Sequence, residues 1–201
     1  MSEFDDPRRV LVVVAHPDDI DFGMAGTVAT LTMAGAEVTY CLATSGEAGP
    51  PEDADRDELK RLREREQRLA AQAVGVHDVR FLGHPDGRVE ATLALRRDIT
   101  RVIRDVRPDL VICQSGQRIW DRMYYSHPDH LAVGEATACA VYPDARNPWA
   151  HPELHEEGLA PHKVPRMWVA GLEPNRYVDI TDVFDRKVAA LRSHASQVAD
   201  M

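Results

Sequence analysis

Short apolar runs alternate with longer segments of mixed polarity along the 201 residues. The first run, RVLVVVA at residues 9–15, is continuous and β-branched, which is typical of a strand buried on both faces. Similar runs predict further strands at residues 37–43, 78–82, 110–113 and 166–171, with a short sixth at 177–180. Apolar positions at helical spacing predict helices at residues 23–34, 56–74, 90–106 and 129–141. A final helix is expected from its cap at Thr181 to residue 196.

Strands that alternate with helices indicate right-handed βαβ units and a mainly parallel sheet. We therefore expect an α/β fold, a three-layer Rossmann-like domain with strand order 3-2-1-4-5 and one additional strand at the edge. A chain of this length builds one full core, so residues 1–201 are expected to form a single domain. The polar segments at 44–55, 115–127 and 142–165 are expected to be loops or irregular structure.

Composition narrows the classes of function. There are 24 Lys and Arg against 33 Asp and Glu, so the net charge is −9 and no basic run favours nucleic acid as a partner. No apolar stretch reaches the roughly 18 residues of a membrane span, and the polar, acidic first nine residues do not resemble a signal peptide. Three widely separated cysteines argue against a disulfide framework, so a cytoplasmic location is expected.

The turn after the first strand concentrates polar chemistry. A dinucleotide-binding domain would place G-x-G-x-x-G there, whereas this chain reads AHPDDID from residue 15 to 21. One histidine among three carboxylates would repel a pyrophosphate and would suit a borderline divalent metal such as zinc. The sequence therefore argues against NAD binding at this turn and indicates a metal site.

A second cluster, HPDH at residues 127–130, follows the fourth strand. In the strand order 3-2-1-4-5 the first and fourth strands are neighbours, and ligands bind in the crevice at their carboxyl ends. Either cluster alone has a simpler interpretation, because an Asp at a strand end is often only a helix cap. Their pairing at matched strand ends favours a metal centre with three protein ligands and an open position, the pattern of catalytic zinc.

These two clusters resemble those of the PIG-L/LmbE-type zinc-dependent N-deacetylases. The resemblance extends to the glycine-containing start of the first helix at 23–27, TSGE at 44–47, RERE at 63–66, PDG at 85–87 and RPD at 107–109. It ends with a helix that carries Arg186, Lys187, Leu191, His194, Ser196 and Gln197. One departure is visible, because many members read AHPDDE, whereas here Ile20 occupies the Glu position and Asp21 follows it.

The resemblance implies a role for each matching residue. His16, Asp19 and His130 would ligate one zinc ion per chain, or another divalent metal such as iron(II). Asp18 would be the general base. His127 would be an electrophilic or acid partner, and either it or Asp18 would protonate the leaving amine.

Three further residues also take roles from the same resemblance. Asp129 would orient a histidine, Arg63 would contact the substrate, and Tyr125 lies where some members place a mobile oxyanion-stabilising tyrosine. Composition alone would make Arg63 part of a solvated, charged helix face.

The implied reaction is hydrolysis of the acetamide of an N-acetylated small molecule, of the N-acetylglucosamine or glycoside type, to acetate and a free amine. The family leaves assembly into homo-oligomers open. Two other interpretations remain: a non-catalytic metal-binding module of the same fold, and an iron(II) oxygenase, since two histidines and one carboxylate also form that facial triad. Those oxygenases usually use a double-stranded β-helix, which this pattern does not predict.

Overall fold

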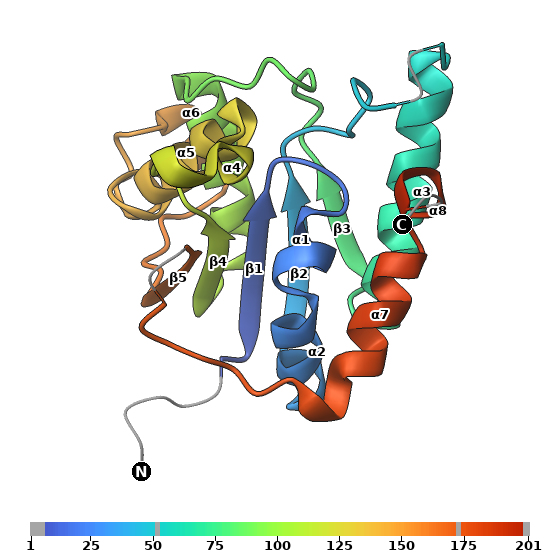
Figure 1. Ribbon diagram of the computed structural model, residues 1–201. Helices are drawn as coiled ribbons and strands as arrows, with labels where there is room; N and C mark the ends of the chain where they lie inside the picture. Colours follow the sequence, from blue (N-terminus) through green and yellow to red (C-terminus); the bar gives the residue numbers. More distant parts are fainter. Residues whose placement is uncertain (1–6, 51–52, 172–173, 199–201) are drawn as a thin grey trace.

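Five parallel strands form one sheet in the order β3-β2-β1-β4-β5, with β1 at its centre (Figure 1). The strand bounds are β1 (Arg9–Val14), β2 (Glu37–Leu42), β3 (Asp78–Phe81), β4 (Leu110–Gln114) and β5 (Arg166–Ala170). These elements come from a computed structural model, which describes residues 7–50, 53–171 and 174–198. The predicted fold class, strand order and parallel pairing are confirmed.

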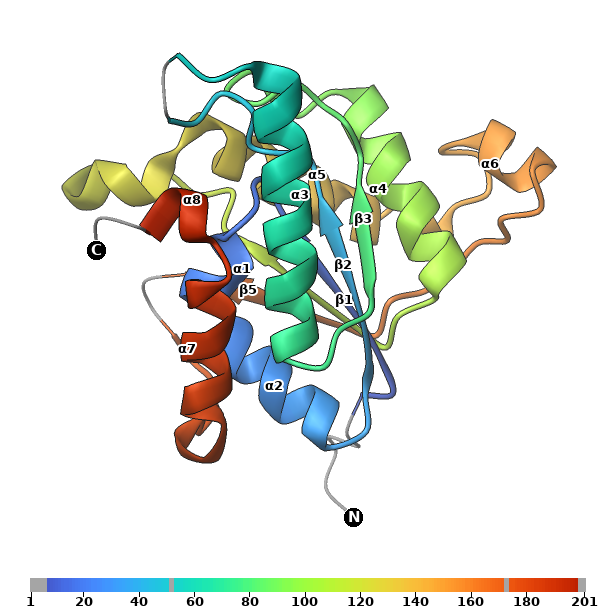
Figure 2. The same ribbon diagram turned by 90° about the vertical axis from the view of Figure 1, so that its right-hand side faces the viewer.

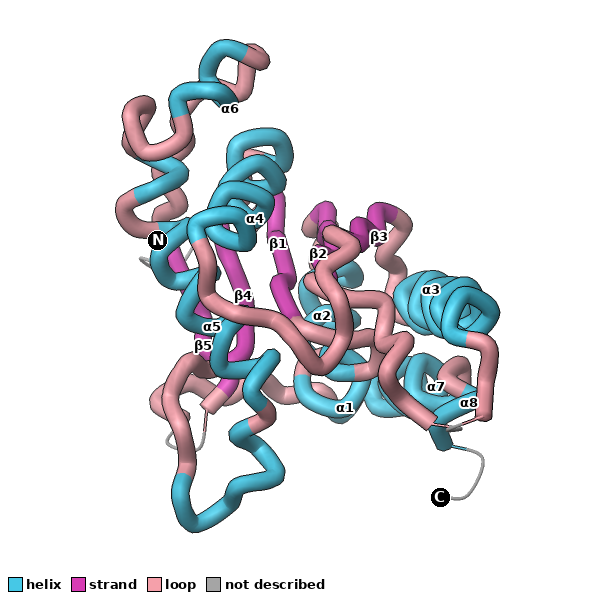
Figure 3. The backbone as a smooth tube through the Cα atoms, turned by 90° about the horizontal axis from the view of Figure 1, so that it is seen from above, coloured by secondary structure: helices cyan, strands magenta, loops and turns pink. Residues whose placement is uncertain are grey.

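Helices cover both faces of the sheet, as the view from the side and the view from above show (Figures 2 and 3). One face carries α1 (Asp19–Gly23), α2 (Ala25–Met33), α3 (Arg56–Ala73), α7 (Phe184–Arg192) and α8 (Ala195–Val198). The other carries α4 (Leu93–Val106) and α5 (Pro128–Val141), and α6 (Pro152–Glu156) lies beyond them. Three short 3-10 helices complete the described part: η1 (Trp120–Ser126), η2 (Asp144–Arg146) and η3 (Thr181–Val183).

Alternation along β1 supplies both cores. Val10, Val12 and Val14 pack toward the α2, α3 and α7 layer, and Leu11 and Val13 pack toward α4 and α5. All five are fully buried, which is why this strand reads as a continuous apolar run. The described residues include no helix that is both long and apolar enough to cross a bilayer.

The predicted sixth strand is wrong, because residues 177–180 pair with no described strand. Tyr177 is 81% exposed, so this segment lacks the buried faces that a strand in this sheet would need. Ile180 instead anchors the segment by packing against the core, where it faces Gly26 so closely that a Cβ there would collide with it.

Three helix predictions also need correction. The final helix is interrupted between Arg192 and Ala195, where the buried side chain of His194 turns inward. The helix expected from residue 90 begins at Leu93, because the hydroxyl of Thr92 accepts the Leu95 N–H as its cap. The first predicted helix starts four residues early, at Asp19, and is interrupted at Met24 between α1 and α2.

Candidate metal centre and active site

The carboxyl ends of β1 and β4 lie side by side and present the two polar clusters to each other. The strands pair from Val10 and Leu110 onward, so they end at the same edge of the sheet. The side-chain oxygen of Gln114 accepts the Ala15 N–H at 2.9 Å, and the Thr44 hydroxyl donates to the Ala15 carbonyl at 3.0 Å. The N–H and the carbonyl of Ala15 are therefore both held by hydrogen bonds just before His16.

Three side chains converge on one point at this edge. His16 Nδ1 lies 3.2 Å from His130 Nε2, His130 Nε2 lies 3.0 Å from Asp19 Oδ1, and His16 Nδ1 lies 3.5 Å from Asp19 Oδ2. Ligand atoms about 2.0–2.1 Å from a tetrahedral zinc are roughly 3.3 Å from one another. The donor set, two imidazole nitrogens and a carboxylate, thus fits a zinc ion both in chemistry and in spacing.

The second nitrogen of His16 faces two more carboxylates. His16 Nε2 lies 3.0 Å from Asp129 Oδ2 and 3.0 Å from Asp86 Oδ1. Because an ionised carboxylate only accepts hydrogen bonds, this arrangement favours a proton on Nε2 and a free lone pair on Nδ1. The ring is therefore oriented with its basic nitrogen toward His130 and Asp19.

Backbone groups hold these two carboxylates in place. Asp129 is fully buried and accepts the N–H groups of Gly87 at 2.8 Å and Val89 at 3.2 Å. Asp86 accepts the Ala48 N–H at 2.8 Å. The resemblance anticipated that Asp129 would face a histidine, and the structure shows that this histidine is His16. Sequence reasoning assigned no role to Asp86, although its P-D-G motif was visible.

The cluster carries an excess of negative charge that suits a cation. Burial disfavours the charged ring of His16, but its hydrogen bonds to Asp129, Asp19 and Asp86 outweigh burial and raise its pKa to about 11. Burial also opposes ionisation of Asp19, yet His130 and His16 hold the pKa of that carboxyl well below its usual range. A bound cation would replace the proton that this geometry otherwise favours on His16.

Asp18 occupies the turn between His16 and α1 in an unusual backbone conformation. Its φ of 82° lies in the left-handed region, which few residues other than glycine adopt. Its Oδ2 accepts a hydrogen bond from the Arg63 guanidinium at 3.0 Å. Burial raises the pKa of Asp18 to about 6, although the charge of Arg63 acts in the opposite direction. A carboxyl with this pKa is suited to accept a proton near neutral pH.

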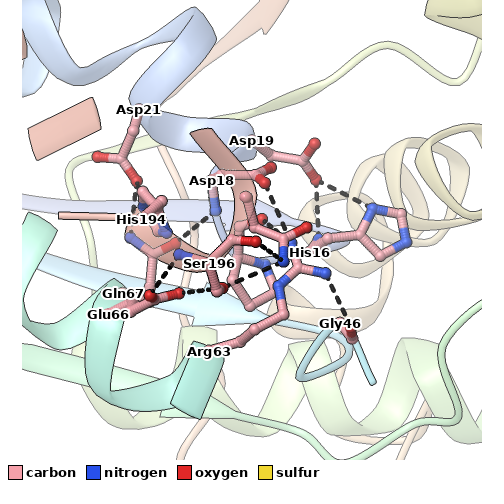
Figure 4. A network of polar contacts seen from close by, with 12 residues as sticks. His16, Asp18, Asp19, Asp21, Gly46, Arg63, Glu66, Gln67, His194 and Ser196 are labelled. Carbon is pink, nitrogen blue, oxygen red and sulfur yellow. Dashed lines mark hydrogen bonds and ion pairs between the residues drawn. The ribbon is translucent and has the colours of Figure 1, made fainter. Parts of the chain in front are cut away.

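Arg63 is turned inward from the charged face of α3 (Figure 4). Its side chain is only 6% exposed and donates to the carbonyls of Gly46 at 2.7 Å and Pro17 at 3.0 Å as well as to Asp18. Gly46 has φ 73°, and a Cβ there would lie 2.3 Å from the guanidinium. The solvated-face interpretation is therefore wrong for Arg63, and its described contacts are with protein groups, whereas the resemblance implied substrate.

His127 stands at the mouth of the cluster and caps α5. Its Nδ1 accepts the Asp129 N–H at 3.2 Å, and its ring centre lies 5.0 Å from that of His16 and 5.2 Å from that of His130. Burial and the nearby His16 and His130 lower the pKa of His127, although Asp129 acts in the opposite direction. Since Nδ1 is already an acceptor, the neutral ring carries its proton on Nε2.

The loop that precedes His127 forms η1 instead of irregular structure. Trp120 is 77% exposed and Met123 is 49% exposed, so neither buries the loop. The side chain of Tyr125 lies outside the described part, and its expected role remains a prediction. A donor atom of His127 also lies within 4.8 Å of those of His16 and His130, so these three imidazoles form a second candidate ligand set.

The part of the sequence that carries these side chains matches a known protein family. Residues 11–141 match the family described as PIG-L, GlcNAc-PI de-N-acetylase, and they span both clusters. The chain belongs to the PIG-L family. The resemblance stated from the sequence is thereby confirmed.

Individual members of the PIG-L family agree with this assignment. Diacetylchitobiose deacetylase of Thermococcus kodakarensis is 34% identical over 200 residues, which cover 96% of this chain and 72% of that protein. The probable N-acetyl-alpha-D-glucosaminyl L-malate deacetylase 2 of Bacillus anthracis is 32% identical and covers 96% and 82%. The structure of N,N'-diacetylchitobiose deacetylase from Pyrococcus horikoshii, bound to its inhibitor MPG, superposes with a TM-score of 0.89 at 31% identity and covers 96% and 72%.

These PIG-L relatives are named deacetylases, which are hydrolases of amide bonds. The prediction of a metal-dependent amidohydrolase is therefore confirmed at the level of the family. The chain also retains a group of His and Asp side chains that is able to hold a metal ion.

Proposed function

We propose that this PIG-L member is a zinc-dependent N-deacetylase that hydrolyses the acetamide of an N-acetylated sugar or glycoside to acetate and a free amine. The observation that carries the proposal is the tetrahedral spacing of His16 Nδ1, His130 Nε2 and the Asp19 carboxylate beside the raised-pKa carboxyl of Asp18. Metal ligands and a proton acceptor on one turn are the parts that water attack on an amide requires.

His16, Asp19 and His130 would hold the metal. Zinc is favoured because imidazole and carboxylate in a three-ligand set leave one position open, as in catalytic zinc sites. A bound zinc ion would polarise the amide carbonyl and acidify water near the site. Asp19 is preferred to His127 as the third ligand because its side chain is only 10% exposed, whereas His127 is exposed at the mouth.

Asp18 would act as the general base. Its carboxylate accepts a proton from the attacking water as the oxygen bonds to the acetyl carbon. The same proton then passes from Asp18 to the amide nitrogen as the C–N bond breaks, so that acetic acid and a neutral amine form, and the acid releases its remaining proton to solvent as acetate. Arg63 acts through Asp18, since its hydrogen bond fixes one carboxylate oxygen and its charge keeps the carboxylate available as a base.

His127 would stabilise the oxyanion as a neutral donor. Its Nδ1 is engaged by the Asp129 N–H, and its lowered pKa favours the neutral ring, so Nε2–H is the group left to donate. A neutral imidazole is a poor source of a full proton and a good hydrogen-bond donor. We therefore assign return of the proton to Asp18, and Asp129 has the separate role of orienting His16.

The substrate class rests on the relatives. Those named above act, by their names, on diacetylchitobiose and on N-acetylglucosaminyl malate, which share an N-acetylated glucosamine unit. We propose the same unit for this chain, attached to a small-molecule aglycone. The proposal includes one domain over residues 1–201 and a cytoplasmic location, which is supported by the unpaired thiols of Cys41, Cys113 and Cys139.

The test is acetate release by zinc-loaded protein from a panel of N-acetylglucosamine, diacetylchitobiose and N-acetylglucosaminyl glycosides. We expect turnover of at least one member, loss of turnover with chelator and recovery with zinc. His130→Ala is the matched control and should lose the metal by elemental analysis. No acetate from any substrate would favour the binding module, and turnover that needs iron and oxygen would favour the oxygenase.

A further inference from the structure

A line of buried hydrogen bonds runs from the α7–α8 connection to the backbone of Asp18 (Figure 4). His194 Nε2 lies 2.8 Å from Asp21 Oδ2, and Gln67 Nε2 donates to the same oxygen at 2.9 Å. Gln67 Oε1 then accepts the Asp18 N–H at 2.8 Å. These contacts connect α1, α3 and the α7–α8 connection to the backbone N–H of Asp18.

The three side chains are placed where polar groups are costly. His194, Asp21 and Gln67 are each 0% exposed, and burial of a polar group without a partner destabilises a protein by a few kcal/mol. Asp21 Oδ1 and His194 Nδ1 have no hydrogen-bond partner among the described residues. Apolar side chains would fill this volume at lower cost, so the line needs a reason other than packing.

Asp21 determines which way the Gln67 amide points. A carboxylate oxygen only accepts, so Gln67 must turn its NH2 group toward Asp21. Its carbonyl oxygen is then directed at the Asp18 N–H. His194 is the second donor to the same Asp21 oxygen, so it fixes that carboxylate from the opposite end.

Asp18 needs such support because of its backbone. A φ of 82° at a residue with a side chain costs of order 1–3 kcal/mol and persists only when the surroundings hold it. Arg63 holds the side chain of Asp18, but the Gln67 carbonyl is the group that holds its N–H. The peptide conformation decides where the carboxylate projects.

We propose that Gln67, Asp21 and His194 are positioning residues that hold Asp18 in its left-handed conformation and so aim its carboxylate at the reacting water. This inference rests on the proposed role of Asp18 as general base. All three are 0% exposed, so they present no surface to a substrate. Many family members carry an acid at the position of Ile20, whereas this chain carries it one residue later, at Asp21. We assign this positioning role to that shifted acid.

Simple anchoring of the chain end would be a different role, and the same segment offers a control for it. Ser196 donates from its N–H at 2.8 Å and its hydroxyl at 2.6 Å to the two Glu66 oxygens, which ties α8 to α3 by hydrogen bonds that are separate from those of the line. Ser196→Ala removes one of these hydrogen bonds. It should lower stability slightly and leave kcat as in the wild type.

The experiment compares kinetics, metal content and structure across four variants. Gln67→Met fills the same volume in α3 without either hydrogen bond. We expect kcat to fall about 10- to 100-fold, by analogy with residues that support metal ligands, with KM and zinc per chain unchanged. His194→Phe should behave in the same way. His194→Gln keeps an N–H donor near the Nε2 position and should recover kcat to within about threefold, together with Ser196→Ala.

Crystal structures of Gln67→Met and His194→Gln give a readout independent of activity. We expect φ of residue 18 to leave the left-handed region in the first variant and to stay there in the second. An unchanged φ in Gln67→Met, loss of zinc in parallel with kcat, or equal damage in His194→Gln and His194→Phe would overturn the inference. If His194→Phe does not fold, the contrast between Gln67→Met and Ser196→Ala decides. A wild type that releases no acetate would refute the proposed function, while φ of residue 18 would still test the line.

Discussion

Arg63 reaches from the middle of α3 to the carboxylate of Asp18, 45 residues earlier in the chain, and donates to it at 3.0 Å. The guanidinium is almost closed to solvent, and two backbone carbonyls take further hydrogen bonds from it. The Arg63–Asp18 ion pair thus combines opposite charges, a direct hydrogen bond and low exposure to solvent. Because desolvation strengthens such an interaction, the pair has more influence on the chemistry than any ion pair on the exposed face of α3.

Removal of Arg63 should damage catalysis without damage to metal binding. Arg63→Ala leaves Asp18 without its cation, so we expect kcat/KM to fall about 100-fold and the acidic limb of the pH profile to move to higher pH. The sign follows from Arg63, whose charge lowers the pKa of Asp18. Arg63→Lys should keep the direction of the charge effect with only part of the rate, because lysine lacks the fork that binds three oxygens. Rates at saturating and limiting substrate, with zinc content as control, check this, and a profile that moves to lower pH would contradict it.

The pH profile itself follows from Asp18. With a pKa of about 6 in the metal-free chain, this carboxyl is protonated below that pH and cannot accept a proton. A bound cation would lower the pKa further, so kcat/KM should fall on the acid side at or below pH 6 with unit slope. Asp18→Asn should lose about 10²–10⁴ in kcat and keep its zinc. An acid limb centred well above pH 7, or near-normal turnover by Asp18→Asn, would exclude Asp18 as the base.

Two variants distinguish the ligand set that includes Asp19 from the set of three histidines that includes His127. Asp19→Ala should lose zinc, because it removes the oxygens next to His16 Nδ1 and His130 Nε2. His127→Ala should keep one zinc per chain and lose about 10²–10³ in kcat, the usual effect of one missing oxyanion donor. Zinc content after dialysis is the measurement. The opposite pattern, with metal lost only in His127→Ala, would establish the set of three histidines.

Gly46 offers a test of how the Arg63 side chain is held. Gly46→Ala introduces a Cβ 2.3 Å from the guanidinium at φ 73°, so we expect the free energy of unfolding to fall by about 1–3 kcal/mol and activity to fall as well. Gly23→Ala is the matched control, since a Cβ there meets nothing within 4 Å and φ is ordinary. Urea unfolding measures the stability of both variants. Equal stability of the two would show that the loop around Gly46 accommodates the added Cβ.

The sheet was predictable because its signal is local. A run such as residues 9–15 is apolar throughout only when both faces are buried, and the two polar clusters follow their strands directly in the sequence. The interruption of the last helix was not predictable, because helical spacing continues across residue 194. At the interruption His194 contacts Asp21, 173 residues away in the chain, and no local pattern announces such a contact.

The residues of the site also divide into those that a local sequence pattern predicts and those that it does not. Asp86 lies on the loop after β3, and its contact with His16 depends on how that loop folds over β1 and not on any local pattern. Arg63 stands among charges of both signs on α3, so composition placed it on a solvated face, and only the family motif distinguished it. Residues that act through a neighbour have no spacing of their own to reveal them.

The contact between His194 and Asp21 also has a consequence for how the chain reaches its active form. The parallel sheet and both cores need nothing from residue 194, whereas the turn that carries Asp18 is supported by it. We therefore expect the strands to assemble first and the turn to acquire its final shape when the α7–α8 connection docks. During refolding, recovery of secondary structure should precede recovery of turnover, and a ligand for the site should favour the docked segment.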